Sequence, residues 1–393
     1  MTSRPSRAAP LYLDFAASAL PAEQVVDAML PWLRGQHANP HSDHWHGQRA
    51  ARAIEEARES LAVLIGGDPE GVIFTSGATE ANNLALKGLL GKARSRLWLS
   101  GIEHKSLLEP AHVLAQDGVQ VTLIDVDPQG RILASKLQDQ LAGDSKPGLV
   151  AVGHGNNEIG TLQDIAGLAK LAHAHGHLLH VDASQTAGHY PLAATDDELD
   201  LICLSSHKMY GPAGIGALYV DPVLLGELQP LLHGGGQERG MRSGTVAPFL
   251  AVGFGVAARL AHQSATEHRQ NMHTLMQVFL ERLEASGVHF SILGHPTLRL
   301  PGHLSLQFPG LSAEDVLTRL LPSLSASTGS ACQSGELRAS HALRALGLSE
   351  AQAGQVIRIS FGRSSLLTEA NEAAALLADA IRGATGVQAY TAV

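Results

Sequence analysis

The sequence predicts an α/β protein in which helices cover both faces of a mostly parallel, seven-stranded sheet. Short apolar runs recur in the first part of the chain, mostly separated by segments of helical length, at 72–74, 97–99, 121–124, 149–152, 178–181, 201–204 and 216–220. The pattern then changes to one long helix from Gly255 to Glu284. Because 393 residues exceed one ordinary hydrophobic core, we expect a smaller α+β domain to follow the large one.

The expected elements can be justified in chain order. An amphipathic helix is expected at 48–65, because apolar residues such as Ile54 and Leu61 recur there at helical spacing. The strand at 72–74 leads into a second helix from Ala81 to Leu90. Beyond the long helix, the sequence predicts strands near 287–292, 303–308 and 356–360 and helices near 313–321 and 369–382.

The predicted domain limits follow from this change of pattern. The large domain is expected to span 15–262, and residues 1–14 are expected to join 263–393 in the small domain. No low-complexity linker separates the two parts, so we expect the domains to pack directly against each other.

The composition excludes several classes of protein. With 45% hydrophobic and 17% charged residues, the chain is predicted to fold rather than to be disordered. Its formal charge of −9 argues against direct contact with nucleic acid or an anionic membrane. No apolar run approaches the roughly 20 residues that span a bilayer, and residues 1–10 lack the apolar core of a secretory signal. The two cysteines, Cys203 and Cys332, exclude a disulfide framework and predict a cytoplasmic protein.

An acidic residue and a lysine follow two successive predicted strands. Asp182 comes directly after the apolar run at 178–181, and Lys208 follows the run at 201–204. Pyridoxal 5′-phosphate (PLP) needs a lysine amine for its aldehyde and a carboxylate that keeps its ring nitrogen protonated. Alone, Asp182 could cap a turn and Lys208 could be a surface lysine. Their order, at the strand ends where open α/β sheets bind ligands, favours a PLP site.

The loop from Thr75 to Glu80 is the candidate phosphate cradle. Its small residues, which include Gly77, Ala78 and Thr79, let backbone N–H groups approach an anion. The helix that follows points its positive end at the same place. Any strand-to-helix turn can carry such residues, so the loop supports the PLP site only in combination with the lysine.

Several separated stretches resemble the motifs of cysteine desulfurases. They occur in family order from about residue 12 to 363 and include 13–17, 39–47, 74–83, 103–106, 156–161, 182–185, 205–212, 235–238, 242–245, 329–332 and 357–360. The resemblance implies a fold-type I PLP enzyme that works as a homodimer. It also implies conversion of L-cysteine to L-alanine, with the sulfur held as a persulfide on an enzyme cysteine. That sulfur would pass to an acceptor or scaffold protein, for iron–sulfur cluster assembly or thio-modification.

The resemblance implies roles for residues around the cofactor ring. Lys208 would bind the cofactor aldehyde and later move the Cα proton of the substrate. Asp182 would pair with the ring nitrogen, and Gln185 would contact the phenolic oxygen. His104 would stack on the ring and assist proton transfer.

The resemblance also implies residues for the two anionic groups. Those that would hold the cofactor phosphate are Gly77, Ala78, Thr79, Ser205, His207 and, from the neighbouring subunit, Thr245. Asn157 and Arg358 would bind the substrate carboxylate, a task that suits the guanidinium fork.

The two cysteines are predicted to differ in role. Cys332 lies in a small, polar stretch between glycines, which is typical of an exposed loop. The resemblance makes it the nucleophile that accepts the substrate's sulfur as a thiolate. Cys203 lies inside the apolar run at 201–204 and is expected to be a buried small hydrophobe.

Two positions depart from the family pattern, and some alternatives remain. Phe15 stands where asparagine is usual, and Gly155 follows His154 where a bulkier residue is common. The alternative functions are a selenocysteine lyase, another aminotransferase-like PLP enzyme, and a catalytically silent sulfur-carrier scaffold. Two histidine-rich stretches, 37–46 and 173–180, lack the carboxylates or cysteines that would complete a metal site, so no metal is expected.

Overall fold

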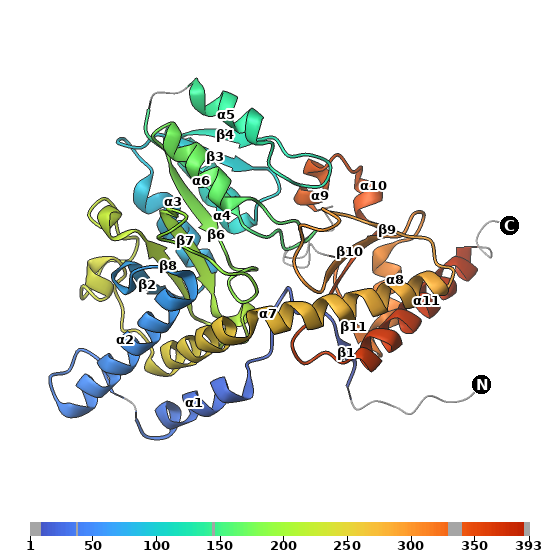
Figure 1. Cartoon of the computed structure of the whole chain (residues 1–393), viewed down its shortest axis with the longest axis horizontal. Helices are drawn as coiled ribbons and strands as arrows, with labels where there is room; N and C mark the ends of the chain where they lie inside the picture. Colours follow the sequence, from blue (N-terminus) through green and yellow to red (C-terminus); the bar gives the residue numbers. More distant parts are fainter. Residues whose placement is uncertain (1–8, 37, 144–145, 329–339, 389–393) are drawn as a thin grey trace.

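The computed structural model describes residues 9–36, 38–143, 146–328 and 340–388 (Figure 1). Cys332, the predicted nucleophile, lies outside the described residues. No helix in the described ranges has the length and apolar character needed to cross a membrane.

A seven-stranded sheet forms the centre of the large domain. Its spatial order is β2 (Val72–Thr75), β8 (Gly216–Val220), β7 (Leu201–Ser205), β6 (Leu178–Asp182), β5 (Gly148–Gly153), β3 (Arg96–Ser100) and β4 (Gln120–Ile124). Only β8 runs against its neighbours β2 and β7, so the remaining strands share one direction. The predicted mostly parallel sheet of seven strands is therefore confirmed.

Helices cover both faces of this sheet, which explains why its strands read as apolar runs. They are α1 (Glu23–Arg34), α2 (Trp45–Ile65), α3 (Ala78–Leu89), α4 (Lys105–Gln116), α5 (Ala134–Ala142), α6 (Ile165–Ala174) and α7 (Pro248–Ala285). One core joins α2, α6 and α7 to one face through buried residues such as Ile54, Leu168 and Phe254. A second core joins α3 and α4 to the other face through Leu84 and Leu107.

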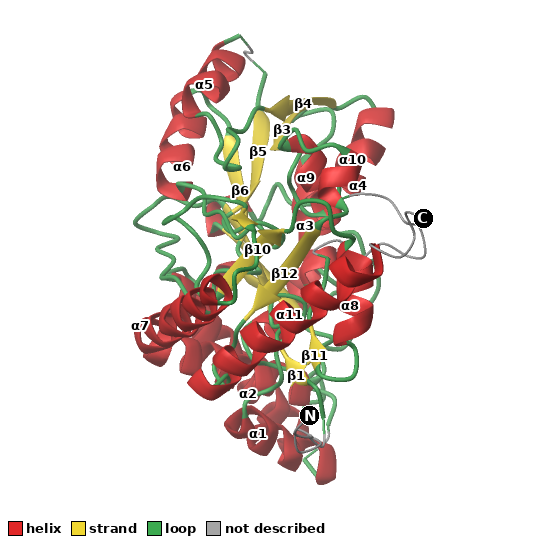
Figure 2. Cartoon of the chain, turned by 90° about the vertical axis from the view of Figure 1, so that its right-hand side faces the viewer, coloured by secondary structure: helices red, strands yellow, loops and turns green. Residues whose placement is uncertain are grey.

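The smaller part of the molecule is built on short strands and four helices in the described ranges. The strands are β1 (Leu11–Tyr12), β9 (Ser291–Ile292), β10 (His303–Gln307), β11 (Leu324–Ser325) and β12 (Val356–Ser360), and the helices are α8 (Ala313–Leu320), α9 (His341–Ala345), α10 (Glu350–Ala353) and α11 (Leu367–Gln388). β10 pairs antiparallel with β9 and β12, and β1 pairs parallel with β11. Helices α8 and α11 lie beside β12 (Figure 2) and share a core with it through Val316, Ile357 and Leu377.

Helix α7 links the two parts. Its first half contributes Phe254 to the core of the large sheet, and its second half contributes Phe279 to the core of the smaller part. The predicted limits at 15 and 262 stay predictions. The predicted strand at 287–292 shrinks to the two residues of β9, and the helix predicted from Ala81 begins three residues earlier at Ala78.

Candidate active site

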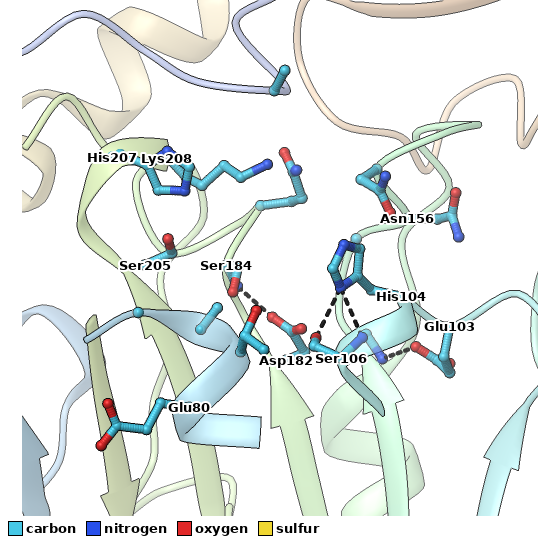
Figure 3. Close-up of a pocket in the computed structure, with 18 of the residues that line it drawn as sticks. Glu80, Glu103, His104, Ser106, Asn156, Asp182, Ser184, Ser205, His207 and Lys208 are labelled. Atoms are coloured by element: carbon cyan, nitrogen blue, oxygen red, sulfur yellow. Dashed lines mark hydrogen bonds between the residues drawn. The ribbon is translucent and has the colours of Figure 1, made fainter. Parts of the chain in front are cut away.

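A cavity of about 360 Å³ opens at the carboxyl edge of the large sheet (Figure 3). Its walls come from segments that follow β2, β3, β5, β6 and β7, as expected for an open α/β sheet. The predicted site residues that line it are Gly77, Ala78, Thr79, His104, Asn157, Asp182, Gln185, Ser205, His207 and Lys208. In Figure 3, His207 and Lys208 reach in from one side and His104 and Asn156 from the other, with Asp182 below them.

Lys208 follows β7 through a single 3-10 turn, Ser206–Lys208, which carries its side chain over the sheet edge. Its Nζ donates to the carbonyl oxygen of Ala16 at 2.5 Å, and Gln185 Nε2 donates to the same oxygen at 2.9 Å. The Ala16 N–H in turn donates to Ser360 Oγ at 2.9 Å. The N-terminal segment therefore holds two of the predicted cofactor residues in place.

The two departures from the family pattern both have a place in this geometry. Phe15 is buried, and the centroid of its ring lies 5.0 Å from the centroid of the Tyr12 ring. A Cβ on Gly362 would lie only 2.3 Å from the Phe15 ring, so glycine there makes room for it. At Gly155, a Cβ would lie 2.8 Å from a methyl carbon of Thr186, so a larger residue after His154 would have to displace this side chain.

Asp182 is held as a hydrogen-bond acceptor at the end of β6. Its Oδ1 accepts from the Ser184 N–H at 2.9 Å, and its Oδ2 accepts from Asn82 Nδ2 at 2.8 Å. Both hydrogen bonds fix the orientation of this carboxyl group, the group that would keep a ring nitrogen protonated. Asn82 had no role predicted from the sequence. The available signal was an amide at a helical position flanked by the buried residues Ala81, Leu84 and Ala85.

His104 caps the N-terminus of α4 and presents one nitrogen to Ser106. Its Nδ1 accepts from the Ser106 N–H at 3.1 Å and lies 2.8 Å from Ser106 Oγ. Desolvation in the cavity lowers the pKa of His104, an effect that Asp182 opposes and Lys208 reinforces. A neutral ring whose Nδ1 accepts must carry its proton on Nε2.

The candidate phosphate site lies at the N-terminus of α3. Thr79, Ser205 and His207 line this part of the cavity, where the first backbone N–H groups of the helix have no partner within the helix. A Cβ on Gly216 would lie 2.7 Å from the Gly77 Cα, so two glycines let the loop sit directly over β8. Thr245 is exposed and does not line this cavity within one chain.

Glu103 also lines the cavity, and the sequence analysis did not single it out. Its Oε1 accepts from Ser100 Oγ at 2.6 Å, and its Oε2 accepts from the Gly153 N–H at 2.7 Å. Burial raises the pKa of Glu103 to about 7, although both hydrogen bonds oppose the shift. Because the burial of Glu103 depends on the packing of β3 against β5, the sequence gave no signal for this shift.

This raised pKa predicts a pH-dependent stability. Between the usual value of 4.5 and about 7, the folded protein binds a proton that the unfolded chain has lost. The free energy of unfolding should therefore fall as the pH rises through this window, by up to about 3 kcal/mol. Glu103→Gln should remove that part of the slope when urea unfolding of the cofactor-free protein is compared at about pH 5 and about pH 8. Equal slopes in the two proteins would show that Glu103 ionises normally.

The comparisons place the chain among known proteins. Residues 11–371 match the model of the family described as aminotransferase class-V. The chain belongs to this family. It is 38% identical over 376 residues to the cysteine desulfurase IscS of Rickettsia akari (strain Hartford), an alignment that covers 95% of this chain and 91% of the relative. A cysteine desulfurase resemblance was predicted from the motifs, and it is confirmed.

Solved structures of similar proteins have the same fold. A NifS-like protein superimposes with a TM-score of 0.88 at 30% identity, covering 95% of this chain and 99% of the other. The structure described as SspA in complex with cysteine superimposes with a TM-score of 0.79 at 35% identity, covering 91% of this chain and 100% of the other. The predicted fold class is therefore confirmed.

In this class-V chain, the two residues predicted to bind a substrate carboxylate lie together, but only one of them lines the cavity. Asn157 lines the cavity, whereas Arg358, on β12, does not. The Arg358 guanidinium donates to the Asn157 carbonyl oxygen at 2.9 Å and to Asp14 Oδ1 at 2.6 Å. Binding of a carboxylate by Arg358 would therefore require its ion pair with Asp14 to loosen.

Cys203 has the environment that the sequence predicted. It is fully buried in β7, and burial raises the pKa of its thiol well above the usual value. A thiol in that state is a poor nucleophile. Cys203 therefore serves as a small core residue.

Proposed function

We propose that this chain is a PLP-dependent cysteine desulfurase, which converts L-cysteine to L-alanine and transfers the sulfur to Cys332. The observation that carries the proposal is that Lys208 and Asp182 line one cavity beside the N-terminus of α3. An amine, a carboxylate and a phosphate cradle are the three features that PLP requires of a protein. The names of the matched relatives support cysteine over selenocysteine as the substrate.

The residues present fit the cofactor. When bound, PLP supplies an electron sink for negative charge at the substrate Cα. Lys208 would hold it covalently and then carry the Cα proton. Asp182, fixed by two donors, would hold a proton on the ring nitrogen. The His104 ring would lie against the cofactor with its Nε2–H toward the cavity.

The anionic ends of cofactor and substrate would be bound by separate groups. The phosphate would accept hydrogen bonds from Thr79, Ser205 and His207 at the positive end of α3. Gln185 would donate to the phenolic oxygen. Asn157 and Arg358 would hold the substrate carboxylate, which orients the substrate sulfur for attack.

The Cys332 thiolate would accept the sulfur. A sulfur–sulfur bond forms as the carbon–sulfur bond breaks, and the electron pair of the broken bond stays on carbon. The carbon takes up a proton and leaves as alanine, while the enzyme keeps a persulfide.

We further propose that an acceptor or scaffold protein in the cytoplasm receives this sulfur. Release of alanine from L-cysteine and formation of an enzyme-bound persulfide by the purified protein test the proposed function, and no alanine release would refute it.

A homodimer with shared active sites is part of the proposal. Thr245 is exposed in one chain and is absent from its own cavity, as expected for a residue that serves a neighbouring subunit. Thr245→Glu should leave the fold of an exposed position intact and repel a phosphate bound across the interface.

Mixing inactive variants tests this sharing. A hybrid of one Lys208→Ala subunit and one Thr245→Glu subunit would contain one doubly damaged site and one intact site. After random exchange of equal amounts, we expect roughly a quarter of wild-type activity, since half of the dimers are hybrids with one working site. Size-exclusion chromatography with distinguishable tags confirms the exchange. No recovery in exchanged dimers would place Thr245 outside the neighbour's site.

A further inference from the structure

Asn82 lies at the centre of a buried hydrogen-bond network below the cavity. It is fully buried on α3, and its amide contacts three other segments of the chain. Nδ2 donates to Asp182 Oδ2 and to Ser106 Oγ, each at 2.8 Å. Oδ1 lies 2.8 Å from His180 Nε2. Both amide hydrogens and the carbonyl oxygen are therefore used where no water can replace them.

Asp182 and His180 together determine which way this amide points. The side chain of His180 is fully buried, and burial lowers its pKa well below the usual value against the opposing charge of Asp182. The ring is therefore neutral near pH 7 and has one N–H to donate. Because Asn82 Oδ1 can only accept, that proton lies on Nε2. The Asp182 carboxylate can only accept, so a flipped amide would set its oxygen against that carboxylate and its N–H against the His180 donor, and both Nδ2 hydrogens are therefore directed at Asp182 and Ser106.

The Ser106 contact extends the network to His104. Ser106 Oγ accepts from Asn82, so its own hydrogen can be donated to His104 Nδ1 at 2.8 Å. This bond and the Ser106 N–H together fix the proton of a neutral His104 on Nε2. One buried amide thus contacts the carboxylate below the cavity directly and the imidazole at its wall through one hydroxyl.

We propose that Asn82 is a positioning residue of the desulfurase reaction, which orients Asp182 directly and His104 through Ser106. The inference rests on the proposed function, because both groups act on a bound PLP ring. It assigns His180 the role of orienting the Asn82 amide. Asn82 itself does not line the cavity, so it acts only through the groups it holds.

Asn82→Leu tests the inference, because it keeps a similar side-chain volume and removes all three hydrogen bonds. Cofactor-free protein titrated with PLP should show a dissociation constant raised by roughly tenfold or more, since Asp182 loses one of its two donors. The visible absorption band of the bound cofactor should also shift, because the carboxylate holds the ring-nitrogen proton less firmly. A change in folding stability alone would alter neither quantity.

Two matched variants separate positioning from stability. Leu86→Val weakens packing on the same helix, where Leu86 is fully buried. It should lower the unfolding temperature and leave the PLP dissociation constant and absorption band unchanged. Ser106→Ala should change the histidine ¹⁵N NMR signals of His104 in the cofactor-free protein, whereas Leu86→Val should leave them as in wild type.

The outcomes decide between the two levels of the account. Suppose that wild-type protein binds PLP and releases alanine. If Asn82→Leu then has the same PLP dissociation constant and the same absorption band as Leu86→Val, the positioning role is wrong and the proposed function stands. If wild-type protein binds no PLP, the proposed function itself fails. Should Asn82→Leu not fold, His180→Phe carries the test. It removes only the donor to Oδ1, so it should raise the PLP dissociation constant as well, and a wild-type value would overturn the inference.

Discussion

Lys208→Ala is expected to abolish turnover of L-cysteine, with a loss of about 10⁴-fold or more. Among the described residues, Lys208 is the lysine that lines the cavity, and its Nζ lies beside the Gln185 amide at the Ala16 carbonyl. Its removal takes away both the covalent attachment of the cofactor and the group that carries the Cα proton. Steady-state alanine release and borohydride reduction followed by peptide mapping measure the two losses.

The control for this variant is another lysine. Lys170→Ala changes an exposed residue on α6 and should leave turnover and the reducible bond as in wild type. A borohydride-reducible cofactor bond that persists in Lys208→Ala would mean that a different lysine carries the cofactor. The assignment of the site would then be wrong.

Cys332→Ser should separate cofactor binding from sulfur transfer. PLP should remain bound, because Lys208 and Asp182 are unchanged. Release of alanine from L-cysteine should fall by about 10²-fold or more, since a serine hydroxyl ionises far less readily than a thiol and cannot accept sulfur. The visible absorption spectrum and an alanine assay on the same sample measure both quantities.

Cys203→Ala is the matched control for the second cysteine. Because Cys203 is buried in β7 with a raised pKa, its loss should leave alanine release close to the wild-type rate. Undiminished desulfuration by Cys332→Ser would contradict the proposed nucleophile. Loss of activity in Cys203→Ala, with normal PLP binding, would contradict it as well.

Much of the fold could be predicted because the apolar runs of a covered parallel sheet are distinctive. The run at 201–204 and the lysine after it needed only local sequence, as did Asp182 after the run at 178–181. The two-residue strands β1 and β11 could not be predicted. They are too short for any periodicity, and their pairing joins Leu11 to Leu324 across nearly the whole chain.

The rest of the site depends on contacts between residues far apart in sequence. Asn82 and Asp182 are separated by 100 positions, and Asp14 and Arg358 by 344. Local patterns carry no information on such pairs. The Arg358 ion pair also shows that the access of a predicted residue to the cavity can depend on a partner, here Asp14, that the motif does not name.

The raised pKa of Glu103 could not be predicted for a related reason. A carboxyl group next to a histidine in a polar stretch reads as a solvated residue. Its burial depends on the packing of β3 against β5, which places the Gly153 N–H at the Glu103 carboxylate. Only the assembled sheet edge shows that this carboxyl is desolvated.

The most direct test of the account is mass spectrometry of the purified, PLP-loaded protein after brief treatment with L-cysteine without reductant. The account predicts one added sulfur atom on the peptide that contains Cys332, none on the peptide that contains Cys203, and alanine released in equal amount to the sulfur bound. An unmodified Cys332 in protein that releases alanine, or no alanine at all, would contradict the proposed desulfurase mechanism.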